Sequence, residues 1–445
     1  MPRINPSRRQ ACVIAVDIGG TTIKAAAVPV EPPGQARGGI LFGEARIPTP
    51  RTAPPSFYAT VAALIERVWA GAQRRCAVLP LVAVAHPGRF LPDGTLAPGT
   101  TPNLGPSPNV FDGLDPAQEV RRRLRRSVDV YAENDAIAQM RFGLVALLRD
   151  PAIRPRLLGE TLVYLGPGTG MGGGVARIGR DGGTTLVTDG HFFDLQVPGY
   201  EDGHWTAEEL FTGPAIARLI EQTNRRLASP IRPAKAERLA ALLARSTDRS
   251  ERATRARRIA DRKGDILALL IETIHRGRIT KVRLERAAGG RLIRHVDEAD
   301  RAWSARDKAA VRGARRFLLG GSVGANPLLG KYLLTGALRR LRARGLRDIA
   351  IFQLPVASRH AGILGIAQAI PSERIRQAVG RLRRPQRGAA YKGSCGQDLR
   401  RGRRSSRRAA WLATGRGGSA TRPAGGTSRR GAASPRPRPA SHAAR

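Results

Sequence analysis

The sequence predicts an α/β protein, and two observations support this fold class. Apolar, strand-like runs alternate with segments of helical periodicity along most of the 445 residues. Two glycine-rich turns, each set between strand-like runs, also recur about 150 residues apart, at 12–25 and 161–175. A chain of this length can hold two or three domains with cores of their own.

The first turn combines glycine and threonine with two charged residues. It reads Asp17-Ile-Gly19-Gly20-Thr21-Thr22-Ile-Lys24. The apolar runs on either side predict a tight β-hairpin, and the bare N–H groups of such a turn can bind an anion. A carboxylate at the end of a buried strand is costly unless a cation such as Mg²⁺ or its water shell compensates it, so we expect Asp17 to face a metal ion. Lys24 would neutralise phosphate, and the alternative is a simple salt bridge between the two.

The second turn has the same residue types without the charges. It reads Gly166-Pro-Gly168-Thr169-Gly170-Met-Gly172-Gly173-Gly174. Either turn alone is consistent with a hairpin that binds nothing. Two such turns in one chain can clasp one polyphosphate.

At this point the chain resembles the ROK family (repressors, open reading frames and sugar kinases) of the actin/hexokinase-like ATPase superfamily. Residues 17–24 resemble its first phosphate motif and 168–174 its second. The segment Tyr131-Ala-Glu-Asn134-Asp135-Ala-Ile-Ala resembles the one that carries the catalytic aspartate. The resemblance covers about residues 11–371. It implies a two-lobed actin/hexokinase-like (ribonuclease H-like) fold with a ligand cleft between the lobes.

Two further segments extend the resemblance toward the C-terminus. Phe317-Leu-Leu-Gly320-Gly321-Ser-Val resembles the glycine turn that faces the adenosine of ATP, and 361–367 resembles the closing helix. The order and spacing of all five segments match the family. The resemblance therefore implies that ATP and Mg²⁺ are the cofactors.

Asp135 is the candidate general base. Transfer of a phosphoryl group to an alcohol needs a carboxylate that receives the hydroxyl proton. Asp135 follows a strand-like run and opens a helix-like stretch at 136–148, so Asn134 or Asp135 could also cap that helix. We interpret Asp135 as the catalytic residue and Asn134 as a residue that orients the sugar hydroxyls.

The resemblance also implies positions around a bound hexose. Pro87-Gly88 and Pro102-Asn103-Leu104 resemble family positions in loops around the sugar, and Glu208 resembles a sugar-binding glutamate. The family's Glu-x-Gly-His sequence is Thr188-Asp-Gly-His191 here, so the usual glutamate is replaced. His191 is either a direct sugar contact or an ordinary histidine.

Many family members carry a cysteine-rich zinc loop after that histidine, and this chain differs. Residues 192–207 contain no cysteine, and Cys12, Cys76 and Cys395 are too scattered to form a Cys-x-x-Cys metal site. We expect no structural zinc. With few, unpaired cysteines, no signal-like segment and no apolar run of about 20 residues, we expect a cytoplasmic protein that does not enter a membrane.

The formal net charge is +41, of which residues 381–445 carry +17 and the rest of the chain +24. Residues 381–445 contain 18 basic residues and one acidic residue, with little apolar periodicity. Such a segment cannot bury enough surface to fold, so we expect 372–445 to be a disordered, Arg-rich tail. It is an accidental extension, a tail that binds nucleic acid or a membrane surface, or a solvated tail without function. Seven Lys against 69 Arg suggest nucleotide-composition bias, so we expect at most weak, nonspecific anion binding and no specific nucleic acid partner.

These landmarks give a predicted domain organisation. Residues 1–10 form an extension, 11–135 the first lobe with the first phosphate motif and the catalytic segment, and 136–371 the second lobe. Predicted helices include 57–71, 118–126, 207–227 and 235–244. Residues 247–316 match no expected pattern.

The predicted function is ATP-dependent phosphorylation of a hexose by a cytoplasmic sugar kinase. Glucose is the best single choice, followed by fructose, mannose and N-acetylmannosamine, and the resemblance favours a homodimer. One alternative is a sugar-responsive regulator, although only 16 residues precede Asp17, too few for a helix-turn-helix domain. The other is a non-catalytic sugar or nucleotide binder.

Overall fold

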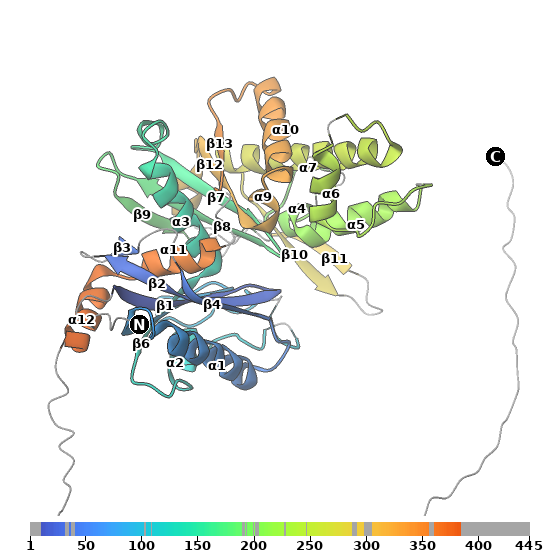
Figure 1. The fold of residues 1–445 in the computed structure, drawn as a ribbon. Coiled ribbons are helices and arrows are strands. Elements are labelled where there is room, and N and C mark those ends of the chain that lie inside the picture. Colours follow the sequence, from blue (N-terminus) through green and yellow to red (C-terminus); the bar gives the residue numbers. More distant parts are fainter. Residues whose placement is uncertain are drawn as a thin grey trace, which may run out of the picture. The chain divides into compact units, whose positions relative to one another are not determined.

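The computed structural model describes residues 10–31, 35–36, 41–101, 104–107, 109–188, 192, 194–198, 200, 204–226, 228–245, 247–286, 292–297, 305–355 and 360–383. Contacts within the chain define two units, Met1–Arg387 and Gly388–Arg445, and all described residues belong to the first. This first unit forms two lobes, each built on a β-sheet (Figure 1). The predicted two-lobed α/β fold is confirmed.

The first sheet combines an antiparallel hairpin with parallel strands. Its strands are β1 (Ala11–Ile18), β2 (Thr22–Glu31), β3 (Gln35–Ala36), β4 (Phe42–Pro48), β5 (Ala77–His86) and β6 (Asp129–Asn134). Their order is β3-β2-β1-β5-β6, and β4 pairs with β2. Because β1, β5 and β6 run parallel, their carboxyl ends meet at one edge, where His86 is the register partner of Asn134.

Helices bury both faces of this sheet. Helices α1 (Pro54–Ala72) and α2 (Pro116–Arg121) share an apolar core with one set of strand residues, such as Ile14 and Val16. The opposite face, with Val13 and Ala15, shares a core with α3 (Asp135–Arg149) and α11 (Ala361–Ala369). This explains why β1 is apolar at nearly every position rather than at every second one.

The second sheet has the order β13-β12-β7-β8-β9. Its strands are β7 (Thr161–Pro167), β8 (Met171–Ile178), β9 (Thr184–Thr188), β12 (Arg316–Leu319) and β13 (Ala350–Gln353). The pair β7–β8 is the predicted second hairpin, and β12 and β13 run parallel to β7. One face shares the core that contains α3 and α11, so this core joins the two lobes.

The other face of the second sheet is covered by the remaining helices. These are α4 (Ala207–Phe211), α5 (Gly213–Asn224), α6 (Ala236–Leu243), α7 (Glu251–His275), α8 (Ala305–Val311), α9 (Gly321–Gly324) and α10 (Leu329–Ala343). The lobe also contains the short 3-10 helix η2 (Arg154–Arg156) and the hairpin of β10 (Lys281–Arg286) and β11 (Leu292–Asp297). The region left unassigned in the sequence thus contains the 25-residue helix α7. One helix was predicted over 207–227, but Thr212 ends α4 and caps α5 by accepting a hydrogen bond from Ala215 N.

Two predicted boundaries are wrong at the C-terminal side. The chain continues past residue 371 as α12 (Ser372–Arg383), in which Ile375 and Ala378 are buried, so the tail does not start at 372. Helices α11 and α12 also pack against β5 of the first sheet, so 361–383 return to the first lobe. Residues 384–445 lie outside the described part of the chain. No helix in the described ranges combines the length and apolarity needed to cross a bilayer.

Candidate active site

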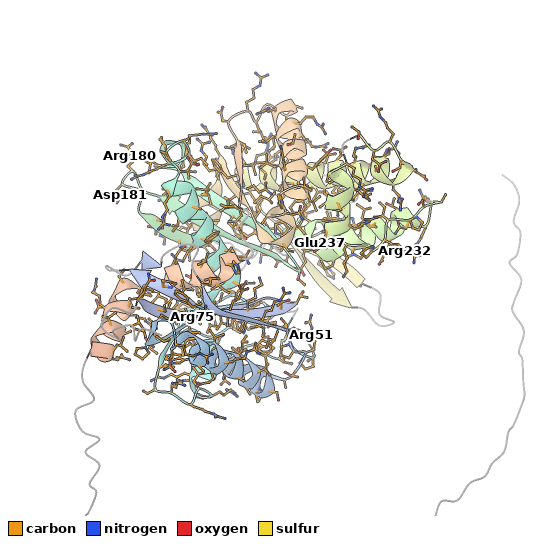
Figure 2. All side chains as sticks on the ribbon, viewed as in Figure 1. Arg51, Arg75, Arg180, Asp181, Arg232 and Glu237 are labelled. Carbon is orange, nitrogen blue, oxygen red and sulfur yellow. The ribbon has the colours of Figure 1, made fainter. Side chains whose placement is uncertain are left out.

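The first hairpin turn is held from behind by the segment after β4. Thr49 Oγ1 donates to Gly19 O at 2.6 Å, Thr49 N donates to Thr21 O at 3.0 Å, and Arg51, labelled in Figure 2, donates to Gly20 O at 3.2 Å. The turn's carbonyls are therefore occupied. In the described part of the chain, no hydrogen bond engages the N–H groups of Gly20 and Thr21, which leaves donors for an anion.

Three charged residues lie in one row across this sheet. Asp17 is the register partner of Lys24, and Lys24 is the partner of Arg46 on β4, so the three side chains share a face. Lys24 Nζ lies 3.5 Å from Asp17 Oδ2, which is the salt bridge considered as the alternative reading. Burial raises the pKa of Asp17, and Lys24 only partly offsets that effect. Arg46 was not predicted from the sequence because its position opposite Lys24 depends on the β2–β4 register.

Helix α11 covers Asp17 on the face of the first sheet that contributes to the core shared by the two lobes. A Cβ on Gly362, in its first turn, would overlap the Asp17 carboxyl group. The carboxyl group therefore lies against the N-terminal end of a helix, where N–H groups favour a negative charge. Only glycine at 362 permits this contact.

The second hairpin turn meets the first. Gly168 N donates to Gly170 O at 2.8 Å, and Gly213 N, at the start of α5, donates to Gly168 O at 2.8 Å. Thr169 Oγ1 lies 3.0 Å from Thr21 Oγ1, so a hydrogen bond joins the tips of the two hairpins. The two predicted phosphate turns thus face each other across one cleft.

Asp135 lies between these hairpins as the first residue of α3. The helix is capped by Asn134, whose Oδ1 accepts from Ala136 N at 2.9 Å and from Ile137 N at 3.1 Å. Burial and, to a smaller extent, the charge of Asp17 raise the pKa of Asp135 to about 7, although the N–H of Ala136 acts in the opposite direction. Of the two residues that could cap the helix, Asn134 is the N-cap, whereas Asp135 accepts from the N–H of the next residue, Ala136. The raised pKa of the Asp135 carboxyl group suits a general base.

Tyr164 on β7 supports the floor of the cleft and was not predicted. Its hydroxyl donates to Gln139 Oε1 of α3 at 2.9 Å and accepts from Gly321 N at 3.1 Å. A Cβ on Gly166 would lie 2.8 Å from this ring, and a Cβ on Gly320 would overlap it. The predicted adenosine turn is therefore tied to the helix that carries Asp135, and Gly320 serves the packing of Tyr164.

The acceptor side of the cleft is formed by two loops and α4. Gly88 has φ +105° and its carbonyl accepts from Asn134 Nδ2 at 2.8 Å. Glu208 Oε2 accepts from Met171 N at 3.2 Å, just after the second turn. Thr101 is 2 % exposed and lines the cleft, but its hydroxyl has no hydrogen-bond partner among the described residues. A buried hydroxyl without a partner is costly, so a ligand hydroxyl is a suitable partner for it.

The cleft has a volume of about 950 Å³ and collects most of the predicted residues. The predicted residues that line it are Asp17, Gly19, Gly20, Thr21, Thr22, Lys24, Pro87, Gly88, Asn134, Asp135, Gly168, Thr169, Gly170, Glu208 and Gly321. Gly320 does not line the cleft, but it precedes the lining residue Gly321 and packs against the Tyr164 ring. Asn103 lies outside the described residues, as do 189–191 of the altered sugar motif, which include His191.

A metal ion here would depend on few protein ligands. Among the described residues there is no group of three or more His, Cys, Asp or Glu side chains that could hold a metal ion. Mg²⁺ in phosphoryl-transfer sites needs only one or two carboxylates, because substrate phosphates and water complete its shell. Asp17 fits that role, and the absence of a zinc site stays a prediction, because several residues at 189–203 are not described.

Comparison with solved structures shows the fold. A ROK-family glucokinase from Streptomyces griseus, in complex with glucose and AMPPNP, has a TM-score of 0.51 at 19% identity, covering 80% of this chain and 98% of that one. A ROK-family protein from Streptococcus pneumoniae, in complex with sucrose, has a TM-score of 0.50 at 15% identity, covering 83% and 99%. A ROK-family transcriptional regulator, a homologue of the E. coli MLC protein, has a TM-score of 0.54 at 13% identity, covering 83% and 81%. No protein-family model matches the sequence, and no curated protein is similar to it.

The fold implied by the resemblance is thereby confirmed. The chain has the two-lobed fold of ROK-family structures, which include both a kinase and a regulator. At 13–19% identity these likenesses concern the fold alone.

Proposed function

We propose that this chain, which folds as ROK-family proteins do, is an ATP- and Mg²⁺-dependent kinase that phosphorylates a hexose, with glucose as the first candidate. The observation that supports it most is the place of Asp135. A carboxyl group with a pKa of about 7 lies in a cleft between two anion-binding hairpins. That combination suits the removal of a proton from an alcohol beside a polyphosphate.

The donor half of the cleft fits a nucleoside triphosphate. The N–H groups of the turn at 19–21 and the Thr21 and Thr169 hydroxyls can donate to phosphate oxygens, and Lys24 and Arg46 supply positive charge. Asp17 would hold Mg²⁺, which when bound would supply positive charge to neutralise the phosphates. Ser322 and Asn326, beside the Gly320–Gly321 turn, line the cleft where the resemblance implies the adenosine.

The acceptor half fits a polyol. Asn134, Glu208 and Thr101 place amide, carboxylate and hydroxyl groups along one side of the cleft, and the resemblance adds Pro87, Gly88, Asn103 and His191. Several hydroxyls of a hexose can pair with such a mixed set of donors and acceptors. Fructose, mannose and N-acetylmannosamine remain alternatives, because Thr188 replaces the family's glutamate.

The residues act in sequence during the reaction. Asn134 and the Gly88 loop orient the sugar hydroxyl toward the γ-phosphate, and Asp135 removes its proton as the O–P bond forms. Lys24 and Arg46 hold the phosphates in line while ADP leaves. Because Asp135 is the first residue of α3 and is held by the N–H of Ala136, it keeps its orientation through the transfer.

The test is ADP release by the full chain with MgATP, across a panel of hexoses and N-acetylhexosamines, compared with Asp135→Ala. We expect a sugar-dependent rate that falls on the order of a thousandfold in the variant, with an unchanged melting temperature or a small increase. An equal rate in the variant would disprove the mechanism. Binding of ATP and sugar without turnover would favour the non-catalytic binder, and sugar-dependent binding of specific DNA would favour the regulator, whose fold this chain shares.

Two further parts of the proposal are a homodimer and a cytoplasmic location. The homodimer rests on the resemblance, and the cytoplasmic location rests on the few, unpaired cysteines. Sedimentation analysis of the full chain at micromolar concentration checks the first, and cell fractionation checks the second.

A further inference from the structure

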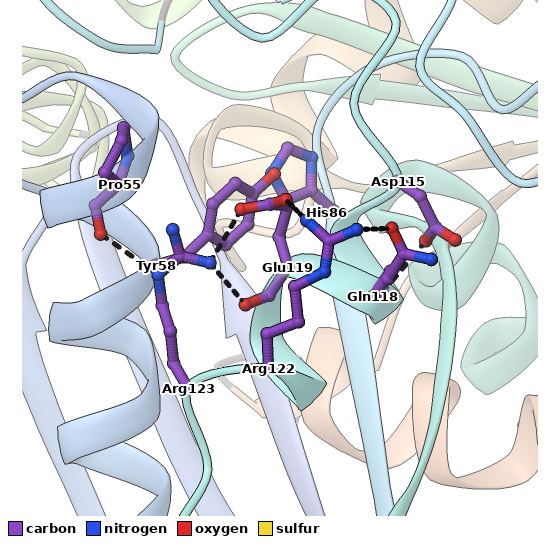
Figure 3. A network of polar contacts seen from close by, with 8 residues as sticks. All are labelled: Pro55, Tyr58, His86, Asp115, Gln118, Glu119, Arg122 and Arg123. Carbon is purple, nitrogen blue, oxygen red and sulfur yellow. Dashed lines mark hydrogen bonds and ion pairs between the residues drawn. The ribbon is translucent and has the colours of Figure 1, made fainter.

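A buried histidine–tyrosine pair lies directly behind the sugar-facing loop. His86 is the last residue of β5 and Tyr58 belongs to α1, and both side chains are fully buried (Figure 3). His86 Nε2 lies 3.1 Å from the Tyr58 hydroxyl, and His86 Nδ1 lies 2.6 Å from Pro87 O. Neither residue lines the cleft, so the proposed chemistry does not use them directly.

The hydrogen bonds define the state of the ring. A carbonyl oxygen only accepts, so His86 Nδ1 carries the proton and donates it to Pro87 O. Nε2 must then accept from the Tyr58 hydroxyl. Burial lowers the pKa of His86 to about 4, so the ring stays neutral near pH 7 and this single tautomer persists.

Surrounding groups fix both rings in place. Tyr58 stacks on His86 with ring centroids 5.9 Å apart, and Phe57 and Phe111 pack around them. On the outer side, Arg123 lies over the Tyr58 ring at 5.9 Å and pairs with Glu119 at 2.6 Å (Figure 3). A hydrocarbon side chain at 86 would fill this apolar space without the cost of burying two nitrogens, so the hydrogen bonds are what histidine adds.

These bonds lead to the catalytic helix through one loop. Pro87 O is held by His86, and the next carbonyl, Gly88 O, accepts from Asn134 Nδ2 at 2.8 Å. Asn134 is also the register partner of His86 and the cap of α3. A Cβ on Gly88 would lie 2.6 Å from Thr101 Cγ2, so the loop has no room to shift on that side.

We propose that His86 and Tyr58 are positioning residues that fix the Pro87–Gly88 loop, and through Gly88 and Asn134 the start of α3, in the arrangement needed to hold the sugar and orient Asp135. The inference rests on the proposed function for its kinetic readout only. Without the Tyr58 hydroxyl, Nε2 becomes a buried acceptor that has lost its donor, and the ring loses the hydrogen bond that sets its angle toward Pro87 O. The anchor of the loop would weaken while the ring stayed in the core.

The kinetic test uses Tyr58→Phe and His86→Phe, which keep aromatic volume and remove the hydrogen bonds. We expect the KM for the sugar to rise and kcat to fall, together lowering kcat/KM by on the order of ten- to a hundredfold, with the KM for ATP within twofold of wild type. His86→Asn, whose amide can still donate to Pro87 O, should recover part of the loss. The matched control is Trp69→Phe, on the same helix and in the same core, which should leave both KM values unchanged.

A second readout needs no activity. Hydrogen exchange of the amides in 87–101 and in the first turn of α3 should accelerate in Tyr58→Phe and His86→Phe, and stay unchanged in Trp69→Phe. If the chain proves not to be a kinase, this result still supports the positioning role. If the Tyr58 and His86 variants match Trp69→Phe in exchange and, where turnover exists, in kinetics, the pair is ordinary core packing and the inference is wrong.

Discussion

The two glycine-rich hairpins look alike in sequence, but their glycines serve different purposes. In the first, Gly19 and Gly20 form an open turn next to the charged row of Asp17, Lys24 and Arg46. In the second, only Gly168 and Gly170 belong to the turn, and the described charge beside it is a carboxylate, Glu208, rather than a cation. The later glycines are packing sites: a Cβ would lie 2.7 Å from Ala136 at Gly172 and 2.5 Å from Ile137 at Gly174, and would overlap Phe192 at Gly173.

This difference shows how one sequence pattern arises from two physical causes. The first hairpin needs glycine so that a ligand can approach its backbone. The second needs glycine mainly so that α3, which carries Asp135, can lie directly on β8. One lobe thus supplies charge to the proposed donor site, whereas the other supplies backbone groups and the position of the catalytic helix.

The largest expected effect comes from adding a methyl group to the second hairpin. Gly173→Ala should lower the free energy of unfolding by about 2–3 kcal/mol, because the new Cβ overlaps the buried Phe192 ring. Gly19→Ala should cost about 1 kcal/mol or less, since its Cβ would lie 3.1 Å from Thr22 O at the open turn. Urea unfolding of both variants checks the contrast, and equal losses would erase the distinction between the hairpins.

Removal of charge should affect only the first hairpin. Lys24→Ala is expected to raise the KM for ATP about tenfold, and Arg46→Ala somewhat less, with little change in stability. Arg177→Ala, which removes an exposed charge from β8, is the control and should leave the KM for ATP unchanged. Steady-state kinetics at two salt concentrations measures this. A comparable effect of Arg177→Ala would indicate that the overall positive charge of the protein attracts ATP, rather than a local site at the first hairpin.

The half-buried carboxyl group of Asp135 should also make the stability of the protein depend on pH. The pKa of Asp135 is raised to about 7 in the folded protein, so the unfolded chain releases this proton at a lower pH than the folded one. The free energy of unfolding should therefore fall as the pH rises from about 4 to 7. Each pKa unit corresponds to about 1.4 kcal/mol, and part of the shift is discounted because Asp135 is only half-buried. In Mg²⁺-free buffer, Asp135→Asn should therefore raise the free energy of unfolding by roughly 2 kcal/mol at pH 8 and have little effect at pH 4.

The second hairpin provides the control for that measurement. Its turn has no titratable group, so any effect of Thr169→Ala should be the same at pH 4 and pH 8. Urea unfolding at both values gives the answer. A stabilisation by Asp135→Asn that is as large at pH 4 as at pH 8 would contradict the assigned pKa.

The smallest expected effect concerns the contact between the two tips. Thr21→Val removes the hydrogen bond to Thr169, which joins two exposed residues, and should change stability by less than about 0.5 kcal/mol. Its effect on the KM for ATP should exceed that on stability, because the hydroxyl can donate to phosphate. Thermal melting with and without ATP separates the two, and a large loss of stability without ATP would show that the tips hold the lobes together.

The local placement of several candidate site residues agrees with the sequence, whereas their roles stay predictions. Asp17 and Lys24 pair across a hairpin, and Asp135 begins a helix after a strand, so short-range patterns were sufficient to place them. The residues that were missed depend on contacts distant in sequence. Arg46 joins the site through strand register, and Tyr164 through the space left by Gly166 and Gly320.

Two fold predictions failed for related reasons. Helix α7 was unassigned because many arginines on its outer face obscure a buried stripe that includes Ile259, Ile266 and Leu270. Helix α12 was assigned to the tail because its composition is highly basic, yet Ile375 and Ala378 form an apolar stripe against the first lobe. In both cases composition was a poorer guide than the spacing of a few apolar residues.

Helix α11 has a consequence for the order in which the protein is made. The strand that carries Asp17 leaves the ribosome long before the helix that covers it, with Gly362 against its carboxyl group. Over this interval about 340 residues are synthesised, and the face of β1 with Val13 and Ala15 lacks the helix that packs against it. A message broken before the codon of residue 360 therefore yields a chain whose first lobe cannot be completed.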